Sequence, residues 1–263
     1  MKGGAARQRR SRKEQEIMAN SRRQASSTEV KPAIFCDFDG TITQLDVTDQ
    51  ILTQLAHPSW REIEQEWMLG LIGSRECLER QMALVDAPIK ELNAVIDAIP
   101  IDPEFAAFCR FAQRQHIPVY ILSDGFDYVI RRVLKRVGLE RQFQGESNLF
   151  ASSLQVDGRR LETSFPYPAK PCAHGCATCK VALIERLRAD FRPVIFVGDG
   201  MSDRFAVDAA DFIFAKRHLL AHCRESGIAC HAFDTFKDVQ NMLKNVLDPT
   251  PARRLSEAAV ALS

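Results

Sequence analysis

Two carboxylates one residue apart follow a short apolar run near the start of the chain. Residues 33–36 are Ala-Ile-Phe-Cys, Asp37 and Asp39 come next, and a Gly-Thr pair follows. Such a run, bounded by turn residues, predicts a buried parallel strand, and side chains two apart in an extended backbone point the same way. Two like charges held that close require a cation or a retained proton. Because Mg²⁺ prefers oxygen and usually binds one or two carboxylates plus phosphate oxygens, the sequence predicts magnesium at this strand end.

Two further predicted strands also end in polar residues. The apolar residues 118–122 lead into Ser123-Asp124-Gly125, and residues 193–197 lead into Gly198-Asp199-Gly200 with Asp203 shortly after. Open α/β sheets bind ligands at the carboxyl ends of their strands. Lys180 stands between these two motifs, at the start of a predicted helix. Each residue alone also fits a plain structural role, such as a helix N-cap for Ser123 or a solvated first-turn lysine.

These motifs occur in a recognisable order. Asp-x-Asp-Gly-Thr, Ser-Asp-Gly, the lysine and Gly-Asp-Gly-x-x-Asp resemble the four motifs of the haloacid-dehalogenase-like hydrolases, over about residues 33 to 216. The resemblance implies an aspartyl-phosphate mechanism with Asp37 as nucleophile and Asp39 as general acid and base. It also implies a magnesium site and a phosphate site. The implied metal-site residues are Asp37, Asp39 through its backbone carbonyl, Asp199 and Asp203, and the implied phosphate-site residues are Ser123, Gly125 and Lys180.

The elements that must position these residues alternate along the chain. Strands separated by helices predict an α/β fold, with a three-layer Rossmann-like parallel sheet and helices on both faces. Residues 46–100 show helical spacing throughout and predict an inserted α-helical cap, which resembles the phosphoserine-phosphatase-like group. Asp157-Gly158 between alternating segments predicts a hairpin with a type I′ turn. We therefore expect a core domain at 31–45 and 101–248, and a tail at 249–263.

Charge is distributed unevenly along the 263 residues. Residues 1–31 carry nine Lys or Arg and three Glu, hence +6, which leaves −5 of the total +1 for the rest. We expect residues 1–30 to be a disordered basic arm without a catalytic role. The acidic body disfavours nucleic-acid binding, and the absence of a long apolar run disfavours a membrane span. Eight cysteines are too few for a secreted disulfide scaffold of this length, so we expect a cytoplasmic protein.

Substrate choice is expected to lie in the cap. In phosphoserine phosphatases a glutamate near the position of Asp46 meets the substrate amine, and here the side chain is one methylene shorter. Arg75 and Arg80 are further candidate substrate contacts, although an arginine on a helix is equally explained by a solvated face. These three assignments are hypotheses about the cap.

A group of possible metal ligands precedes the lysine. The run from residue 172 to residue 180 contains Cys172, His174, Cys176 and Cys179. It is similar to the methionine-salvage branch of the superfamily, whose members dephosphorylate a methylthio keto-enol sugar phosphate. Four such groups could hold a structural Zn²⁺ that secures Lys180. The alternative is three free thiols, because the spacing is tighter than in usual zinc knuckles.

The functional prediction is a Mg²⁺-dependent phosphatase acting on a small phosphorylated metabolite. The first candidate substrate is 2-hydroxy-3-keto-5-methylthiopentenyl-1-phosphate, and phosphoserine or a phosphorylated amino alcohol comes next. A phosphotransferase or mutase would use the same chemistry with water excluded. The alternative to an enzyme is a non-enzymatic zinc-binding module built around the cysteine run.

Overall fold

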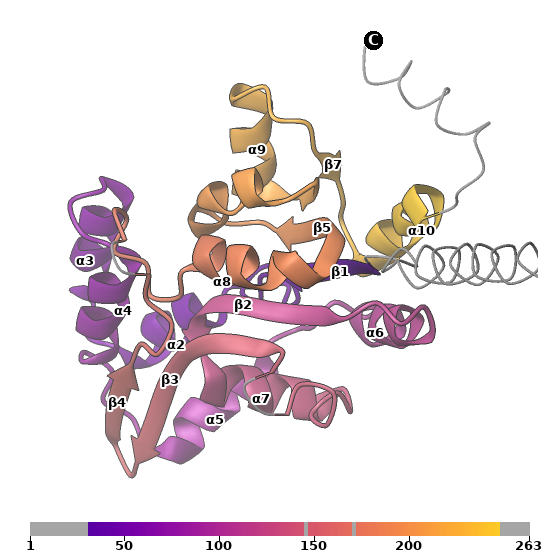
Figure 1. Cartoon of the computed structure of the whole chain (residues 1–263). Helices are drawn as coiled ribbons and strands as arrows, with labels where there is room; N and C mark the ends of the chain where they lie inside the picture. The colour runs from indigo at the N-terminus through magenta and orange to yellow at the C-terminus, as the bar shows by residue number, and fades with distance from the viewer. Residues whose placement is uncertain (1–30, 145–146, 170–171, 248–263) are drawn as a thin grey trace, which may run out of the picture. The chain divides into compact units, whose positions relative to one another are not determined.

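The sheet of this protein places the strand that carries the two carboxylates at its centre. The computed structural model describes residues 31–144, 147–169 and 172–247. Seven strands form one sheet in the order β4-β3-β2-β1-β5-β6-β7 (Figure 1). The strands are β1 Lys31–Cys36, β2 Val119–Phe126, β3 Leu149–Asp157, β4 Arg160–Ser164, β5 Phe191–Gly198, β6 Phe212–Ala215 and β7 His231–Ala232. β1/β2, β2/β3, β5/β6 and β6/β7 pair in parallel, and β3/β4 pair antiparallel.

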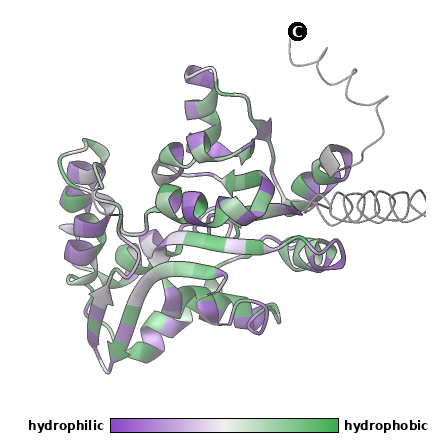
Figure 2. Ribbon diagram, viewed as in Figure 1, coloured by the Kyte–Doolittle hydropathy of each residue, from purple (hydrophilic) through white to green (hydrophobic). Residues whose placement is uncertain are grey.

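Both faces of the central strands are apolar. In β1, Ile34 and Cys36 belong to one buried cluster, whereas Ala33 and Phe35 belong to another. This alternation follows from the period of two in a strand, which sends successive side chains to opposite faces. The central strands are accordingly apolar over most of their length, whereas the edge strand β4 is largely hydrophilic (Figure 2). A sheet that is apolar on both faces must be covered on both.

Helices cover both faces. Leu243 of α10 (Phe236–Leu247) joins the cluster of Ile34, as do residues of α6 (Phe105–Arg114) and α7 (Asp127–Arg136). Residues of α8 (Lys180–Leu187) and α9 (Arg217–Glu225) join the cluster of Phe35. In Figure 1, α8 and α9 lie on one side of the sheet and α7 on the other. The predicted three-layer α/β fold is therefore confirmed.

The segment between β1 and α6 is an inserted helical block. Its elements are α2 Val47–Leu55, α3 Trp60–Met68, α4 Ser74–Met82 and α5 Ile89–Ala98. The two ends of the block meet, because Thr43 bridges Ile101 and the Gln44 N–H donates to the Pro100 carbonyl at 2.9 Å. The helical periodicity of this segment therefore predicts its secondary structure correctly. The block and the sheet belong to one compact unit that begins at Pro32.

The chain reverses its direction of travel across the sheet beside β1. It runs outward from β1 through β2 and β3 to β4, and then returns to β5 on the other side of β1. Such a switch point opens a crevice at the carboxyl ends of the flanking strands. The residues after β1 and β5 and the end of β2 are therefore brought together by topology.

The predicted type of the β3–β4 turn needs correction, and the segments that follow β5 and α8 are 3₁₀ helices. The β3–β4 turn consists of Gly158 and Arg159, and only Gly158 has a positive φ (62°), which matches a type II′ turn and not the predicted I′ turn. The residues after β5 form two 3₁₀ segments, η2 Met201–Phe205 and η3 Val207–Ala209. The helix that starts at Lys180 ends at Leu187 and is followed by another 3₁₀ turn. The predicted arm at 1–30 and tail at 249–263 lie outside the described residues.

Candidate active site

The first two carboxylates lie just past the carboxyl end of β1. The Asp37 N–H donates to the Val197 carbonyl of β5 at 2.9 Å, which ties the two strand ends together. Asp37 is buried, and Asp39 is partly buried. Asp39 accepts a hydrogen bond of 3.0 Å from the Val47 N–H, at the first residue of α2. The Asp39 carboxylate therefore lies where the sheet meets the helical block.

Gly40 allows the chain to turn tightly beside a third carboxylate. Its φ of 72° is left-handed, and a Cβ on this residue would lie 2.3 Å from an oxygen of Asp199. Asp199 follows β5, and its other oxygen accepts a 2.8 Å hydrogen bond from the Thr41 hydroxyl. Only glycine combines this φ with this approach, so the geometry requires a glycine after Asp39.

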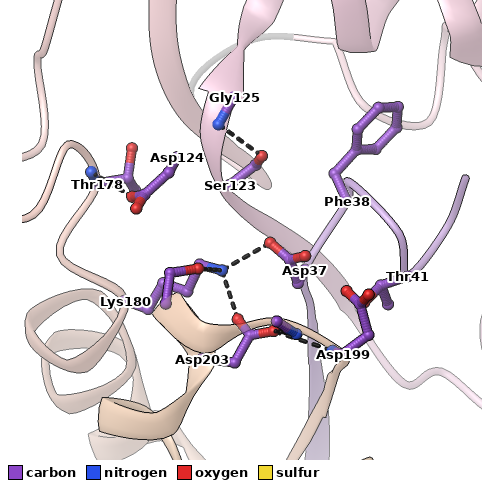
Figure 3. A network of polar contacts seen from close by, with 12 residues as sticks. Asp37, Phe38, Thr41, Ser123, Asp124, Gly125, Thr178, Lys180, Asp199 and Asp203 are labelled. Carbon is purple, nitrogen blue, oxygen red and sulfur yellow. Dashed lines mark hydrogen bonds and ion pairs between the residues drawn. The ribbon is translucent and has the colours of Figure 1, made fainter. Parts of the chain in front are cut away.

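Lys180 is the cation at the centre of the acidic group. Its Nζ lies 2.6 Å from Asp37 Oδ1 and 2.5 Å from Asp203 Oδ1 (Figure 3). Lys180 is the first residue of α8 and is buried, as is Asp203. The second oxygen of Asp203 accepts the backbone N–H groups of Asp199 and Gly200 at 3.0 and 2.9 Å. Asp203 thereby holds the loop after β5 and the lysine in one arrangement.

The acidic group carries more negative than positive charge. Oxygens of Asp37, Asp199 and Asp203 all lie within 4.8 Å of one another, and Lys180 is the ammonium bonded between two of them. Burial, and then the neighbouring Asp203, raise the pKa of Asp37 well above its ordinary range. The same two causes raise the pKa of Asp199. The three carboxylates outnumber the two cations bonded to them, Lys180 and Arg217, and such a group of oxygens fits a hard divalent cation such as Mg²⁺.

The end of β2 supplies hydroxyl and amide groups to the same place. Ser123 is buried, and its Oγ accepts the Gly125 N–H at 3.0 Å. A Cβ on Gly125 would lie 2.3 Å from an oxygen of Asp39, so the backbone here approaches that carboxylate closely. The structure therefore brings all seven motif residues to one edge of the sheet. They lie at the ends of β1, β2 and β5, at the start of α8 and in η2.

The candidate cap residues lie on or beside the helical block. Asp46 is exposed and caps α2 by accepting the Asp49 N–H at 3.0 Å. The guanidinium of Arg75 lies 5.5 Å from the centre of the Phe165 ring. Arg80 forms an ion pair of 2.6 Å with Glu66, which links α4 to α3. No contact in these positions identifies a substrate group, and their role in binding stays a prediction.

The cysteine run folds into a cluster of three. The sulfur atoms of Cys172, Cys176 and Cys179 lie within 4.8 Å of one another. His174 does not join them, because its ring stacks on Phe205 with 3.8 Å between the ring centres. Of the four predicted zinc ligands, the structure thus brings three together.

Two residues of the site were not identified from the sequence. Arg217 Nη1 lies 3.1 Å from Asp199 Oδ2 and 3.2 Å from the Gly40 carbonyl, and Lys216 Nζ donates to the Thr41 carbonyl at 3.1 Å. Their only signal in the sequence is a pair of cations directly after the strand at 212–215. Because this strand is parallel to β5, its end lies at the same edge of the sheet as Asp199.

Comparison with known proteins identifies the family. The model of the haloacid dehalogenase-like hydrolases matches residues 34–206, more than half of the chain. The chain belongs to this family. The match spans the acidic residues after β1 and β5 and the lysine that starts α8. The chain is accordingly a phosphoric monoester hydrolase of the haloacid dehalogenase type, and the alternative of a non-enzymatic zinc module is not retained.

Curated relatives show which members of the family this chain is similar to. The chain is 29% identical over 218 residues to a 2-hydroxy-3-keto-5-methylthiopentenyl-1-phosphate phosphatase of Bacillus mycoides, covering 82% of this chain and 97% of the relative. It is 30% identical over 221 residues to the bifunctional enzyme MtnB/MtnX of Bacillus licheniformis, covering 83% of this chain. The match spans half the length of that bifunctional relative.

Solved structures share the fold. A phospho-aspartyl intermediate analogue of phosphoserine phosphatase superposes with a TM-score of 0.59 at 19% identity, over 81% of this chain and 98% of that one. The predicted resemblance to phosphoserine phosphatases is confirmed at the level of fold. Among the residues that the structure describes, no helix has both the length and the apolar character needed to cross a membrane.

Proposed function

We propose that this phosphatase transfers the phosphoryl group of its substrate to Asp37 and then to water. The arrangement of Lys180 supports this proposal, because its ammonium lies 2.6 Å from Asp37 and within the same buried group as Asp203. A phosphoryl group carried on Asp37 would be within reach of this ammonium. Phosphoryl transfer asks a protein chiefly for positioning and for neutralisation of charge, and this site offers both.

Asp39 is the proposed general acid and base. Burial raises its pKa to about 7, although the hydrogen bond from the Val47 N–H opposes the shift. A carboxyl that exchanges its proton near neutral pH can protonate the leaving oxygen and then accept a proton from water. The close approach of Gly125 to this carboxylate places it beside the hydroxyl of Ser123. Ser123, the Gly125 N–H and Lys180 are the proposed phosphate-binding groups.

Magnesium is the proposed cofactor. The carboxylates of Asp37 and Asp199, with the Asp39 carbonyl, would hold the ion, and Asp203 would support it. When bound, the ion would neutralise charge on the phosphate oxygens. Asp203 contributes without the metal as well, because it orients Lys180 and the two backbone N–H groups after β5.

The proposed substrate is 2-hydroxy-3-keto-5-methylthiopentenyl-1-phosphate. Support comes from curated relatives that carry this activity in their names and match most of this chain. The helical block is the proposed cap and selects the substrate beyond its phosphate. Asp46 is the N-cap of the first helix of that block, next to Val47, whose N–H donates to Asp39. It is the first candidate for contact with the rest of the substrate.

The nucleophile is tested by Asp37→Asn. We expect turnover of a generic aryl phosphate to fall at least about 1,000-fold, because an amide cannot carry the phosphoryl group. Circular dichroism should show an unchanged fold. Mass spectrometry of acid-quenched wild-type enzyme should find one added phosphoryl group on the peptide containing Asp37. Activity retained by Asp37→Asn would remove Asp37 as the nucleophile.

The substrate is tested by comparing kcat/KM among phosphate esters. The proposal expects the methylthio keto-enol phosphate to exceed phosphoserine and phosphoethanolamine at least about 100-fold, about 2.7 kcal/mol in transition-state binding. A preference for phosphoserine would support the amino-acid alternative. Transfer to an added alcohol in preference to water would support a phosphotransferase.

A further inference from the structure

The three clustered thiols form a site that the phosphatase mechanism does not use. Their sulfur atoms lie within 4.8 Å of one another, and none is in a disulfide. Two sulfurs bound to one tetrahedral zinc ion at about 2.3 Å each lie about 3.8 Å apart, so shifts of no more than about 1 Å would let all three bind one ion. We propose that Cys172, Cys176 and Cys179 bind one zinc ion as thiolates.

The surroundings of the cluster favour a metal over a disulfide. A disulfide would join two of the sulfurs and leave the third unused, whereas all three converge here. The Cys176 N–H points at the Cys172 sulfur at 3.5 Å, an arrangement that stabilises a thiolate. A cavity of about 410 Å³ borders all three cysteines, and it gives a solvent molecule access to the fourth position. Because His174 is stacked on Phe205, we assign that position to water.

The loop that carries the thiols is attached to the helical block. The Gly175 carbonyl accepts the Arg75 N–H of α4 at 3.1 Å. The hydroxyl of Ser74, a buried residue that begins α4, accepts the Ala177 N–H at 3.0 Å. The Gly73 and Gly175 backbones touch so closely that a Cβ on Gly73 would lie 2.4 Å from the Gly175 oxygen.

The same loop is attached to the acidic site. The Thr178 N–H donates to Asp124 at 2.8 Å, beside Ser123 in β2. Cys179, a proposed zinc ligand, is directly followed by Lys180. A metal ion that holds the loop in one conformation therefore fixes α4, β2 and the lysine relative to one another. This positioning role rests on the function proposed for Lys180, whereas the zinc site itself does not.

Metal binding is tested on the full-length protein under reducing conditions, with excess Mg²⁺ present to occupy the carboxylates. We expect elemental analysis to find one zinc per chain. Replacement of zinc by Co²⁺ should produce the charge-transfer absorption of a cobalt–thiolate complex, which carboxylate ligands do not give. Cys176→Ser and Cys172→Ser should lose this absorption and most of the zinc. Cys230→Ser, a partly buried cysteine outside the cluster, is the matched control and should retain both.

The effect on the fold is tested with the unmutated protein, because replacing a cysteine by serine changes local packing as well as metal binding. Removal of zinc by a strong chelator should lower Tm by at least about 5 °C, and added zinc should restore it. Turnover of aryl phosphate should fall about 10-fold and recover together with Tm.

Two results would overturn the proposal. One is less than about 0.1 zinc per chain after incubation with Zn²⁺. The other is cobalt–thiolate absorption that survives in both cluster variants. A phosphatase that binds no zinc would refute this site and leave the proposed function intact. A protein that binds zinc but shows no phosphorylation of Asp37 would support this site and refute the proposed nucleophile.

Discussion

At the scale of the residue, the site depends on a small number of charged groups held at close range. Lys180 pairs with Asp37 and Asp203, and each remaining oxygen of Asp199 and Asp203 has its own donor. Because the three carboxylates and Lys180 are buried, the loss of one partner leaves an uncompensated charge away from water, which is costly. Single substitutions should therefore destabilise the protein strongly in this site and only weakly at exposed positions.

The raised pKa of Asp39 predicts a dependence of stability on pH. Folding raises this pKa from 3.8 to about 7, chiefly through burial. A carboxyl with a raised pKa stabilises the fold while it is protonated, and this contribution is lost as pH rises through about 7. Asp39→Asn is neutral at every pH. In chelator-treated protein, its Tm should therefore rise relative to the wild-type Tm between about pH 4 and pH 8.

Asp157→Asn removes an exposed carboxylate from the hairpin and serves as the control. Its Tm should stay parallel to the wild-type Tm over the same range. A constant difference between Asp39→Asn and the wild type would show that Asp39 titrates alike in the folded and unfolded chains.

Arg217 is predicted to position Asp199 for metal binding. Its guanidinium joins Asp199 to the Gly40 carbonyl, although the side chain is 45% exposed. Arg217→Ala should raise the Mg²⁺ concentration for half-maximal activity about 10-fold. The Mg²⁺-dependent increase in Tm should need a similarly higher concentration. Arg224→Ala, an exposed position on the same helix, should change neither.

The backbone of Arg217 offers a second comparison. Its φ of 49° is left-handed, which costs a residue with a Cβ about 1–2 kcal/mol. Arg217→Gly should therefore be more stable than Arg217→Ala by about 1 kcal/mol, measured by urea unfolding, and should share its magnesium defect. Equal magnesium responses of Arg217→Ala and the wild type would remove the positioning role.

At the scale of the element, the contact between α4 and the thiol loop is the most constrained junction. Gly73→Ala would place a methyl group against the Gly175 backbone, which cannot move aside as a flexible side chain would. We expect a loss of about 1–3 kcal/mol in the free energy of unfolding. We also expect reduced turnover, because the loop leads into Lys180.

Gly70→Ala is the control for the clash at Gly73, because it adds a methyl group that meets no other atom at a position of positive φ. Gly70 also lies in the connection between α3 and α4, but its added Cβ would meet no atom within 4 Å. Its φ of 73° alone should cost about 1 kcal/mol and leave turnover unchanged. Equal turnover of the Gly73→Ala and Gly70→Ala variants would argue against a link between the junction and the site.

At the scale of the whole molecule, the proposed catalytic groups and the three clustered thiols all lie within residues 31–247. The first 30 residues contribute the excess of positive charge and none of the predicted site residues. Deletion of residues 1–29 should therefore leave kcat/KM within about twofold of the full chain and Tm nearly unchanged. Steady-state kinetics and thermal unfolding of the two proteins would measure this. A large loss of activity would assign the basic segment a role in catalysis or folding.

The sequence by itself determined the class of enzyme and the class of fold. Short apolar strands ending in Asp37, Ser123 and Asp199 are local patterns, and parallel strands place their carboxyl ends at one edge whatever the details. The helical periodicity of residues 46–100 is likewise local, and the structure contains four helices there. The type of these strands and helices, and their order along the chain, could therefore be predicted from the sequence alone.

Only the tertiary structure decided which distant residues meet. Arg217 reaches Asp199 because β6 lies beside β5, and strand order is not encoded in any short stretch. His174 leaves the predicted zinc set because Phe205, from another element, stacks against its ring. The turn at Gly158 is of type II′ because pairing across β3 and β4 sets the register. Such outcomes depend on packing between segments far apart in sequence, where local propensity carries little information.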